Sequence, residues 1–466
     1  MTRSTTTDTW ADKGLMRFLA APPPAERLDD TTVQKRYPKL RLQVFLGIFV
    51  GYAGYYLVRN NVPLVATILR DEEGFSTLGL GIITNAVLVA YGISKFLSAI
   101  VSDRSSARLF LPIGLVLSAV ANLFIGFVPG VGASVAFFAV IMIFNGFFQG
   151  MGWPPSGRTL VHWFSTSERG SKTALWNIAH NVGGAGSGAL AGLALATFGT
   201  WQAAFWFPGI VCLVIAVIAF FLLRDTPESE GLPPIEEYRD DPAPVESDAA
   251  DAEATTWQTV NRYVIRNATM VKLALANVFV YTLRYGVLVW APVYLADERG
   301  ASLGEGIAGF SLFELAGIPG TLLCGYLSDK VFRGRRSPAG ITFLIGVFLA
   351  VLVYWLSPVE WPLGVSYAAL VVIGGLIYGP VMLIGLQALD LSPRKVAGTA
   401  AGFTGLFGYV LGATLASTGI GLAVHTFGWD TTFILILACV LLAIAFMYSV
   451  GRDERVLRER QLADHA

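Results

Sequence analysis

The sequence predicts an all-α membrane protein in which twelve transmembrane helices form two pseudo-symmetric six-helix bundles. Three observations lead to this prediction. Hydrophobic residues far outnumber charged ones, twelve apolar stretches are long enough to cross a bilayer, and several landmarks of the first half recur about 225 residues later.

Composition defines the class of protein. Hydrophobic residues make up 54% of the 466 residues and charged residues only 14%, whereas soluble domains carry about 25% charged residues. The formal net charge is zero, which indicates no nucleic-acid partner. The cysteines, Cys212, Cys324 and Cys439, lie in apolar runs without the spacing of a metal site or a disulfide framework. The polar N-terminal region lacks a secretory signal, so the first span should direct insertion into the lipid bilayer.

The transmembrane helices are predicted from apolar stretches of roughly twenty or more residues. Several connections are very short, such as those at residues 129–132 and 198–200, and they force neighbouring helices to run antiparallel. The predicted spans are 42–68, 78–101, 109–128, 133–155, 172–196, 201–223, 270–296, 305–327, 338–356, 362–389, 396–423 and 430–450.

The distribution of basic residues predicts the orientation in the membrane. The loops of one side carry only Arg70 and Arg299, whereas those of the other side are strongly basic. We therefore expect both chain termini to be cytoplasmic, in a plasma membrane. The basic side carries Lys35, Arg36, Lys39, Arg41, Arg104, Arg108, Arg158, Arg169, Lys172, Lys330, Arg333, Arg335, Arg336, Arg394 and Lys395.

These boundaries divide the chain into five predicted parts: a cytoplasmic tail at 1–41, a bundle at 42–223, a cytoplasmic linker at 224–269, a bundle at 270–450 and a tail at 451–466. The linker breaks the apolar pattern, because acidic residues lie there among Ala and Pro. We interpret it as a solvated, partly disordered tether without a ligand.

An internal repeat relates the two bundles. Arg59 and Arg284 lie 225 residues apart in the first and seventh spans, and Pro155 and Pro380 lie 225 apart in the fourth and tenth. Ser102-Asp103-Arg104 and Ser328-Asp329-Lys330, after the second and eighth spans, lie 226 apart. Parallel six-helix repeats of this kind place a substrate site between the halves, near the bilayer midplane.

Five ionisable residues lie inside predicted spans, where each costs at least about 2.5 kcal/mol and therefore needs a reason. They form polar stripes at helical spacing, because residues three, four or seven positions apart share a helix face. Tyr52, Tyr56 and Arg59 form one such stripe, and Trp176, Asn177 and His180 share another face. Tyr91 accompanies Lys95, and Tyr281 accompanies Arg284; the remaining charge is Glu314.

The balance of these charges predicts an anionic substrate. Arg59, Lys95 and Arg284 supply three positive charges and Glu314 one negative charge, which suits a phosphate dianion. Arginine grips phosphate oxygens bidentately and keeps its proton, and histidine gains charge near neutral pH, so His180 can help to receive the phosphate. Glu314 is expected to balance charge rather than to touch the ligand.

Two other patterns are set aside. His425 and Asp430 have the His-x4-Asp spacing of some acyltransferases, but they lie in a predicted outer turn without supporting motifs. Residues 183–188, a glycine-rich run, resemble a phosphate loop but lie within an apolar span, where close helix packing explains them better. No phosphate-binding Gly-x4-Gly-Lys-Ser/Thr loop is present, so ATP-driven transport is not supported, and we predict neither enzymatic activity nor a cofactor.

Long stretches of the chain resemble the organophosphate:phosphate antiporters of the major facilitator superfamily, and within them the bacterial glycerol-3-phosphate transporters. The resemblance runs through nearly the whole chain after residue 40. The matching stretches are FLGIFVGYAGYYLVRN (45–60), AYGISKF (90–96), GMGWPPSGR (150–158), WNIAHNVGG (176–184), RDTPESEGLPPIEEY (224–238), ANVFVYTLRYG (276–286), ELAGIPGTLLCGYLSDKVFRG (314–334), YGPVMLIGL (378–386) and GTAAGFTGLFGY (398–409).

The resemblance implies a bacterial carrier that exchanges glycerol 3-phosphate for inorganic phosphate by alternating access. It implies that Arg59 and Arg284 bind phosphate and that Lys95 and His180 assist. The bundles would rock about the site, with loops carrying Asp103, Arg104, Asp329 and Lys330 clamping the cytoplasmic side. The remaining expected lining residues are Tyr52, Tyr56, Tyr91, Trp153, Trp176, Asn177, Tyr378 and Tyr409.

Two positions depart from the family pattern. A lysine is expected after the first arginine, where Asn60 stands, and an aspartate shortly after the second, where Val289 stands. We interpret this as the joint loss of a gating salt bridge, which leaves no lone buried charge. The eleventh span has no Lys, Arg, His, Asp or Glu between Val396 and Thr418, which favours a small ester. The alternatives are an antiporter of another organophosphate, such as a hexose phosphate, and a membrane sensor of organophosphates; nothing demands more than a monomer.

Overall fold

The computed structural model describes residues 18–102, 105–130, 134–240, 260–332, 335–392 and 397–464. Within these ranges the secondary structure is helical, and no strand is found. Ten helices of the described residues are long and apolar enough to cross a membrane. The last of these runs through the predicted eleventh and twelfth spans, and the glycine-rich fifth span lies outside the ten. The chain is thus an all-α protein with the predicted series of membrane helices.

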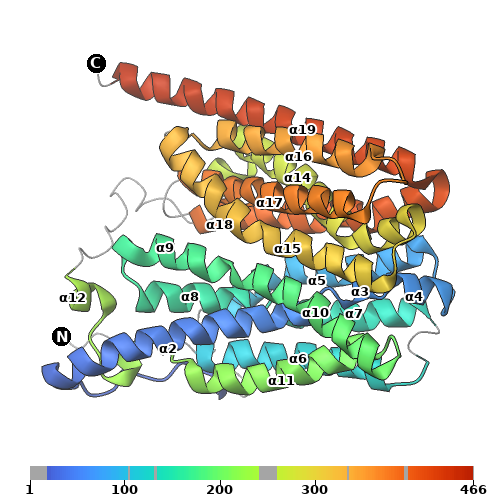
Figure 1. Ribbon diagram of the computed structural model, residues 1–466. Coiled ribbons are helices and arrows are strands. Elements are labelled where there is room, and N and C mark those ends of the chain that lie inside the picture. The colour runs from blue at the N-terminus through green and yellow to red at the C-terminus, as the bar shows by residue number, and fades with distance from the viewer. Residues whose placement is uncertain are drawn as a thin grey trace.

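The first half of the chain forms helices that lie together in the lower part of Figure 1. They cover the predicted spans, but the first span is interrupted at residues 58–60 and 65, the fourth at 150–152 and the fifth at 178, and the fourth continues beyond its predicted end at 155 to residue 163. They are α2 (Asp30–Leu57), α3 (Asn61–Leu64), α4 (Ala66–Asp71), α5 (Thr77–Ser102), α6 (Ala107–Phe127), α7 (Val135–Gln149), α8 (Trp153–Trp163), α9 (Thr166–Asn177), α10 (Ala179–Phe198) and α11 (Ala203–Leu222).

The second half lies above it in Figure 1. Its seventh span is a continuous helix of 32 residues, and its last helix bends at Gly428, where φ is 79°. The elements are α14 (Ala268–Arg299), α15 (Leu303–Tyr326), η5 (Leu327–Val331), α16 (Arg336–Leu356), α17 (Leu363–Asp390), α18 (Ala397–Phe407), η7 (Gly408–Gly412), η8 (Leu415–Gly419) and α19 (Ile420–Asp464).

The helices α2 and α19 fix the polarity of the molecule. The start of α2 and the end of α19 lie at the same end, on the left of Figure 1, which we call the terminal end. The opposite end, which holds α4 and the connection from α10 to α11, is called the far end. Gly199 ends α10 with a φ of 71°, a conformation that glycine adopts without strain, and so permits the short predicted connection to α11.

Residues 224–240, at the start of the predicted linker, fold onto the first half. Tyr238 of α12 (Ile235–Arg239) stacks on Tyr37 of α2 with ring centroids 4.0 Å apart. Asp225 accepts a 2.8 Å hydrogen bond from the Ser106 hydroxyl and another from the backbone N–H of Ala107, so it caps α6. This stretch is therefore an ordered part of the protein rather than a free tether, and residues 241–259 lie outside the described residues.

The two halves meet mainly along α10 and α5 of the first half. α10 packs against α15, and α5 packs against η7 and η8. Glycine permits the first contact, because a Cβ at Gly184 would lie 2.8 Å from Cδ of Glu314 on α15. The glycine-rich run is therefore a packing surface, as predicted. It is part of α10, the helix that borders the predicted site.

Candidate functional site

The predicted site begins at the interruption of the first span. α2 ends at Leu57 and α3 starts at Asn61, so Arg59 lies on a short non-helical segment. Arg59 is nevertheless buried, with 1% of its surface exposed. Because charge within a span is costly, a buried arginine there indicates a functional role.

The guanidinium of Arg59 is held on three sides. Its Nε donates a 3.0 Å hydrogen bond to Oε1 of Gln149. The rings of Tyr56 and Tyr91 lie 4.0 and 4.1 Å from its Cζ, close enough for cation–π contact. Both terminal nitrogens lack a hydrogen-bond partner among the residues that the structure describes. These nitrogens form the planar fork that matches a phosphate or carboxylate.

Arg284 lies in the middle of α14 and is also buried. Its Nη2 donates a 3.3 Å hydrogen bond to the hydroxyl of Tyr378 on α17, and Tyr378 in turn donates at 2.7 Å to Oε2 of Glu314. Asn181 of α10 donates to the same carboxylate at 3.4 Å and to the Glu314 backbone oxygen at 3.0 Å. Glu314 thus balances the positive charge of Arg284 through Tyr378. Its hydrogen bonds from Asn181 also connect the second half to the first.

Aromatic side chains connect the two arginines. The ring of His180 lies 5.7 Å from Tyr56, which covers Arg59, and 5.3 Å from Tyr378, which binds Arg284. His180 Nδ1 is hydrogen-bonded to the Asn177 carbonyl, which fixes the ring. Tyr91 and Tyr409 meet at 4.8 Å on another side of the site. The predicted residues from both halves therefore converge on one place.

Lys95 continues this site. Its Nζ lies 4.6 Å from the ring of Trp153 and 6.0 Å from that of Tyr409. Trp153 contacts Trp176 at 6.5 Å, and Trp176 packs on Tyr52 at 4.6 Å. Trp153 is 40% exposed, whereas Arg59 is buried. Lys95 thus extends the positive site from the buried arginines toward a more accessible edge.

Sequence reasoning missed Gln149 and Asn181. Both are buried and bind predicted site residues directly, Gln149 to Arg59 and Asn181 to Glu314. The sequence prediction starts from ionisable residues and their neighbours on the same helix face, which includes the amide Asn177 beside His180 but neither Gln149 nor Asn181. The available signal was the Asn145–Gln149 pair, two amides four residues apart in an apolar helix.

The predicted clamp at the terminal end is largely untested, because Asp103 and Arg104 lie outside the described residues. Asp329 and Lys330 lie on η5, and Lys330 is exposed. An ion pair instead joins the two halves at the far end, where Arg70 of α4 contacts Asp297 of α14 at 2.7 Å. Asn60 and Val289, the two departures from the family pattern, are both buried. Because both side chains are neutral, neither leaves an unpaired charge inside the protein.

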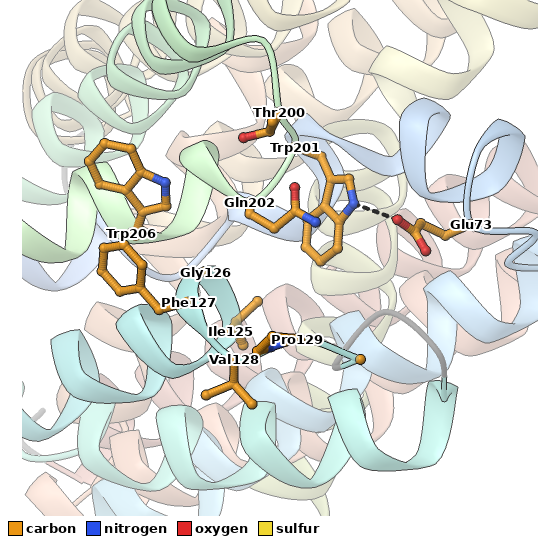
Figure 2. Close-up of a pocket in the computed structure, with 11 residues that line it drawn as sticks. Glu73, Ile125, Gly126, Phe127, Val128, Pro129, Thr200, Trp201, Gln202 and Trp206 are labelled. Atoms are coloured by element: carbon orange, nitrogen blue, oxygen red, sulfur yellow. Dashed lines mark hydrogen bonds between the residues drawn. The ribbon is translucent and has the colours of Figure 1, made fainter.

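Two other features do not compete with this site. A cavity of about 470 Å³ at the far end is lined by Glu73, Trp201, Trp206 and neighbours, and Trp201 donates a 2.8 Å hydrogen bond to Glu73 (Figure 2). None of its described lining residues is a cation, so it is unsuited to an anion. Asp430 accepts a 2.8 Å hydrogen bond from Trp355, which gives it a structural role. The described residues contain no cluster suited to a metal ion.

Comparisons with known proteins identify the family of this chain. Residues 44–417 match the family model of the Major Facilitator Superfamily. The chain is 50% identical over 433 residues to a Bacillus subtilis protein named glycerol-3-phosphate transporter, covering 93% of this chain and 97% of that protein. It is 35% identical over 427 residues to the Escherichia coli membrane sensor protein UhpC, covering 91% and 95% respectively.

A solved structure shares the fold at low sequence identity. A bacterial homologue of the human lysosomal transporter Spinster, crystallised in an inward-facing and unoccupied conformation, aligns with a TM-score of 0.70 at 16% identity. The alignment covers 89% of this chain and 97% of the other. The arrangement of helices is therefore that of a known transporter fold.

Proposed function

Because the chain belongs to the organophosphate:phosphate antiporters of the Major Facilitator Superfamily, we propose that it imports glycerol 3-phosphate in exchange for inorganic phosphate. One observation carries the proposal. Arg59 is buried between the halves, and neither of its terminal nitrogens has a hydrogen-bond partner in the described part of the chain. An anion with several oxygens satisfies such a group, since an unpaired buried donor is costly.

The choice of ester rests on similarity and on charge. The Bacillus subtilis relative, at 50% identity, is named for glycerol 3-phosphate. In addition, residues Ala397–Thr418 of the eleventh span contain no Lys, Arg, His, Asp or Glu that could add a charge to the site. A small ester therefore needs only the phosphate cradle and the neutral tyrosines, whereas a larger sugar phosphate would call for further polar partners.

The proposed transport cycle is a rocking of the two bundles about the bound phosphate. Phosphate bridges Arg59 and Arg284 and draws the halves together, whereas two facing cations repel when the site is empty. The empty carrier then resists reorientation, which makes exchange obligatory. Binding drives the motion only through a difference in affinity between the two states. In this proposal both termini are cytoplasmic, the carrier lies in a bacterial plasma membrane, and a monomer suffices.

Proteoliposomes loaded with phosphate test the proposal directly. The purified protein should accumulate labelled phosphate by counterflow, and external glycerol 3-phosphate should compete better than hexose phosphates or phosphoglycerates. Arg59→Lys and Arg284→Lys should each abolish exchange while the protein remains folded, because lysine keeps the charge but loses the fork. Near-normal exchange in both variants would refute the two-arginine site.

A membrane sensor is the second candidate, favoured by the 35% identity to UhpC. In that case the protein would bind an organophosphate and signal through its terminal end without exchanging it. The same vesicles discriminate between the two functions. Binding of phosphate without counterflow supports the sensor, whereas counterflow at a rate that depends on Arg59 supports the antiporter.

A further inference from the structure

Four polar side chains lie together where the first-half helices are otherwise apolar. Ser118 and Asn122 come from α6, and Asn145 and Gln149 come from α7. All four are completely buried. Buried polar groups within spans need hydrogen-bond partners, and these partners reveal what the cluster does.

The cluster binds the backbone where the first span is interrupted. At this point the backbone N–H of Arg59 bonds to the Tyr56 carbonyl, so the Tyr55 carbonyl loses the partner that a regular helix would give it. Nε2 of Gln149 donates to the Tyr55 carbonyl at 2.9 Å. Asn122 and Asn145 both donate to the Val58 carbonyl, at 3.1 and 2.9 Å. The cluster thus replaces the hydrogen bonds that the helix loses.

Gln149 also binds the side chain that the interruption carries. Its Oε1 accepts the 3.0 Å hydrogen bond from Arg59 Nε, while its Nε2 donates to Ser118 Oγ at 2.9 Å. The amide is neutral, so it orients the guanidinium without cancelling its charge. With Nε occupied, Arg59 is left with its two terminal nitrogens for another ligand.

The second half holds its arginine, Arg284, in a different way. α14 runs without interruption through Arg284, and the buried residues in the middle of α16, including Phe343, Leu344, Val347 and Val351, are apolar, whereas its buried polar residues Ser337 and Tyr354 lie near its two ends. Arg284 is bound by Tyr378 of α17, just as Arg59 is bound by Gln149 of α7. Each arginine is thus bound by a residue of the span three further along its own half, but among the described residues only Arg59 lies at an interruption with an amide cluster around it.

We propose that Gln149, supported by Ser118, Asn122 and Asn145, is a positioning residue that fixes the interruption of the first span and presents the terminal nitrogens of Arg59 to the anion. This inference rests on the proposed function, because the anion is taken to be phosphate. It assigns the geometry of the first-half arginine to neutral amides that touch no substrate.

The test is the dissociation constant for inorganic phosphate in purified protein, measured beside the melting temperature. Gln149→Leu removes the acceptor of Arg59 Nε and should weaken phosphate binding about tenfold or more, because a hydrogen bond to a charged group is lost. Thr159→Val is the matched control, since Thr159 is completely buried in α8 of the same span, and its hydroxyl donates to the Pro155 carbonyl of its own helix at 2.8 Å rather than to the cluster. It should change the dissociation constant less than about twofold.

A second variant covers the case in which Gln149→Leu does not fold. Gln149→Glu keeps an oxygen for Arg59 Nε but pairs the guanidinium with a fixed negative charge, so phosphate binding should again weaken at neutral pH. An unchanged dissociation constant in either folded variant, with only a lower melting temperature, would reduce Gln149 to a structural residue and overturn the inference. Absence of phosphate binding in the wild-type protein would instead refute the proposed function.

Discussion

The hydroxyl of Tyr378 donates a 2.7 Å hydrogen bond to the carboxylate of Glu314 and accepts one of 3.3 Å from Arg284. The acid is completely buried, and its Oε1 has no hydrogen-bond partner among the described residues. Glu314 is therefore hydrogen-bonded to Arg284 indirectly, through the hydroxyl of Tyr378. In the proposed cycle its negative charge stabilises the empty carrier by balancing Arg284, and bound phosphate then supplies part of this negative charge.

Glu314→Gln should make the protein more dependent on phosphate. The amide still accepts from Tyr378, but Arg284 loses its counter-charge, which destabilises the empty protein by on the order of 3 kcal/mol. Phosphate restores a negative charge, so it should raise the melting temperature of the variant more than that of the wild type. Equal phosphate-induced shifts in the two proteins would show that Glu314 does not balance the site.

Asp297→Asn should loosen the far end of the molecule. Asp297 pairs with Arg70 across the halves at 2.7 Å and also accepts a 3.1 Å hydrogen bond from Trp429. Spin labels at Glu72 and Glu360, exposed residues of the two halves, should report longer or broader distances in the variant, measured in a background without native cysteines.

Asp71→Asn is the control for this experiment. Asp71 also contacts Arg70, at 2.9 Å, but it belongs to the same half and cannot hold the halves together. The label distances should remain those of the unmodified protein. If the label distances of Asp297→Asn also remain those of the unmodified protein, the Arg70–Asp297 pair is a surface contact of little consequence, as many exposed ion pairs are.

Much of the fold followed from the sequence because lipid imposes simple constraints. Apolar length predicted the spans, and the cost of buried charge singled out Arg59, Arg284 and Glu314, which the structure brings close to a common set of aromatic residues. The interruption at Arg59 was not predicted, because the mean hydropathy of residues 42–68 is high despite the polar run Arg59-Asn60-Asn61, and the hydrogen bonds that stabilise the interruption come from distant α6 and α7. Hydropathy carries no information on such partners.

The ordered structure at the start of the linker also could not be predicted from composition. Acidic and proline-rich residues indicate a solvated tether, yet Asp225 binds the first turn of α6 and Tyr238 stacks on Tyr37. These are long-range contacts of single side chains, and a composition average does not contain them. The same limit hid Gln149, whose role depends on lying next to Arg59 in space.

Asp225→Ala should release this segment. The substitution removes the cap of α6, which typically costs about 1 kcal/mol, and exposes the segment to protease at Arg224 and Arg239. Limited trypsin digestion in detergent should cut the variant faster than the wild type. Glu237→Ala is the control, because it removes only an exposed ion pair with Arg27 and should leave the digestion pattern unchanged. Equal cutting of the two variants would contradict a capping role for Asp225.

Gly184→Ala should impair exchange by disturbing the contact between the halves. A Cβ at this position would lie 2.8 Å from Cδ and 3.0 Å from Cγ of Glu314, so either the acid or α15 must move. Overpacking of this kind typically costs about 1–3 kcal/mol, and here it displaces the residue that offsets Arg284. We expect a large fall in the maximal exchange rate, together with a weaker response of the melting temperature to phosphate.

Gly192→Ala separates this effect from a general effect of alanine in a helix. Gly192 lies on the same helix, and its added Cβ would meet Cγ2 of Ile307 at 3.8 Å, an ordinary packing distance. Both substitutions raise helix propensity by about 1 kcal/mol, so any gain from the backbone should appear equally in the two variants. Gly192→Ala should exchange phosphate at nearly the wild-type rate. Loss of exchange in both variants would mean that α10 must flex during the cycle. Normal exchange in both would mean that the close packing of Glu314 against Gly184 is not needed for transport.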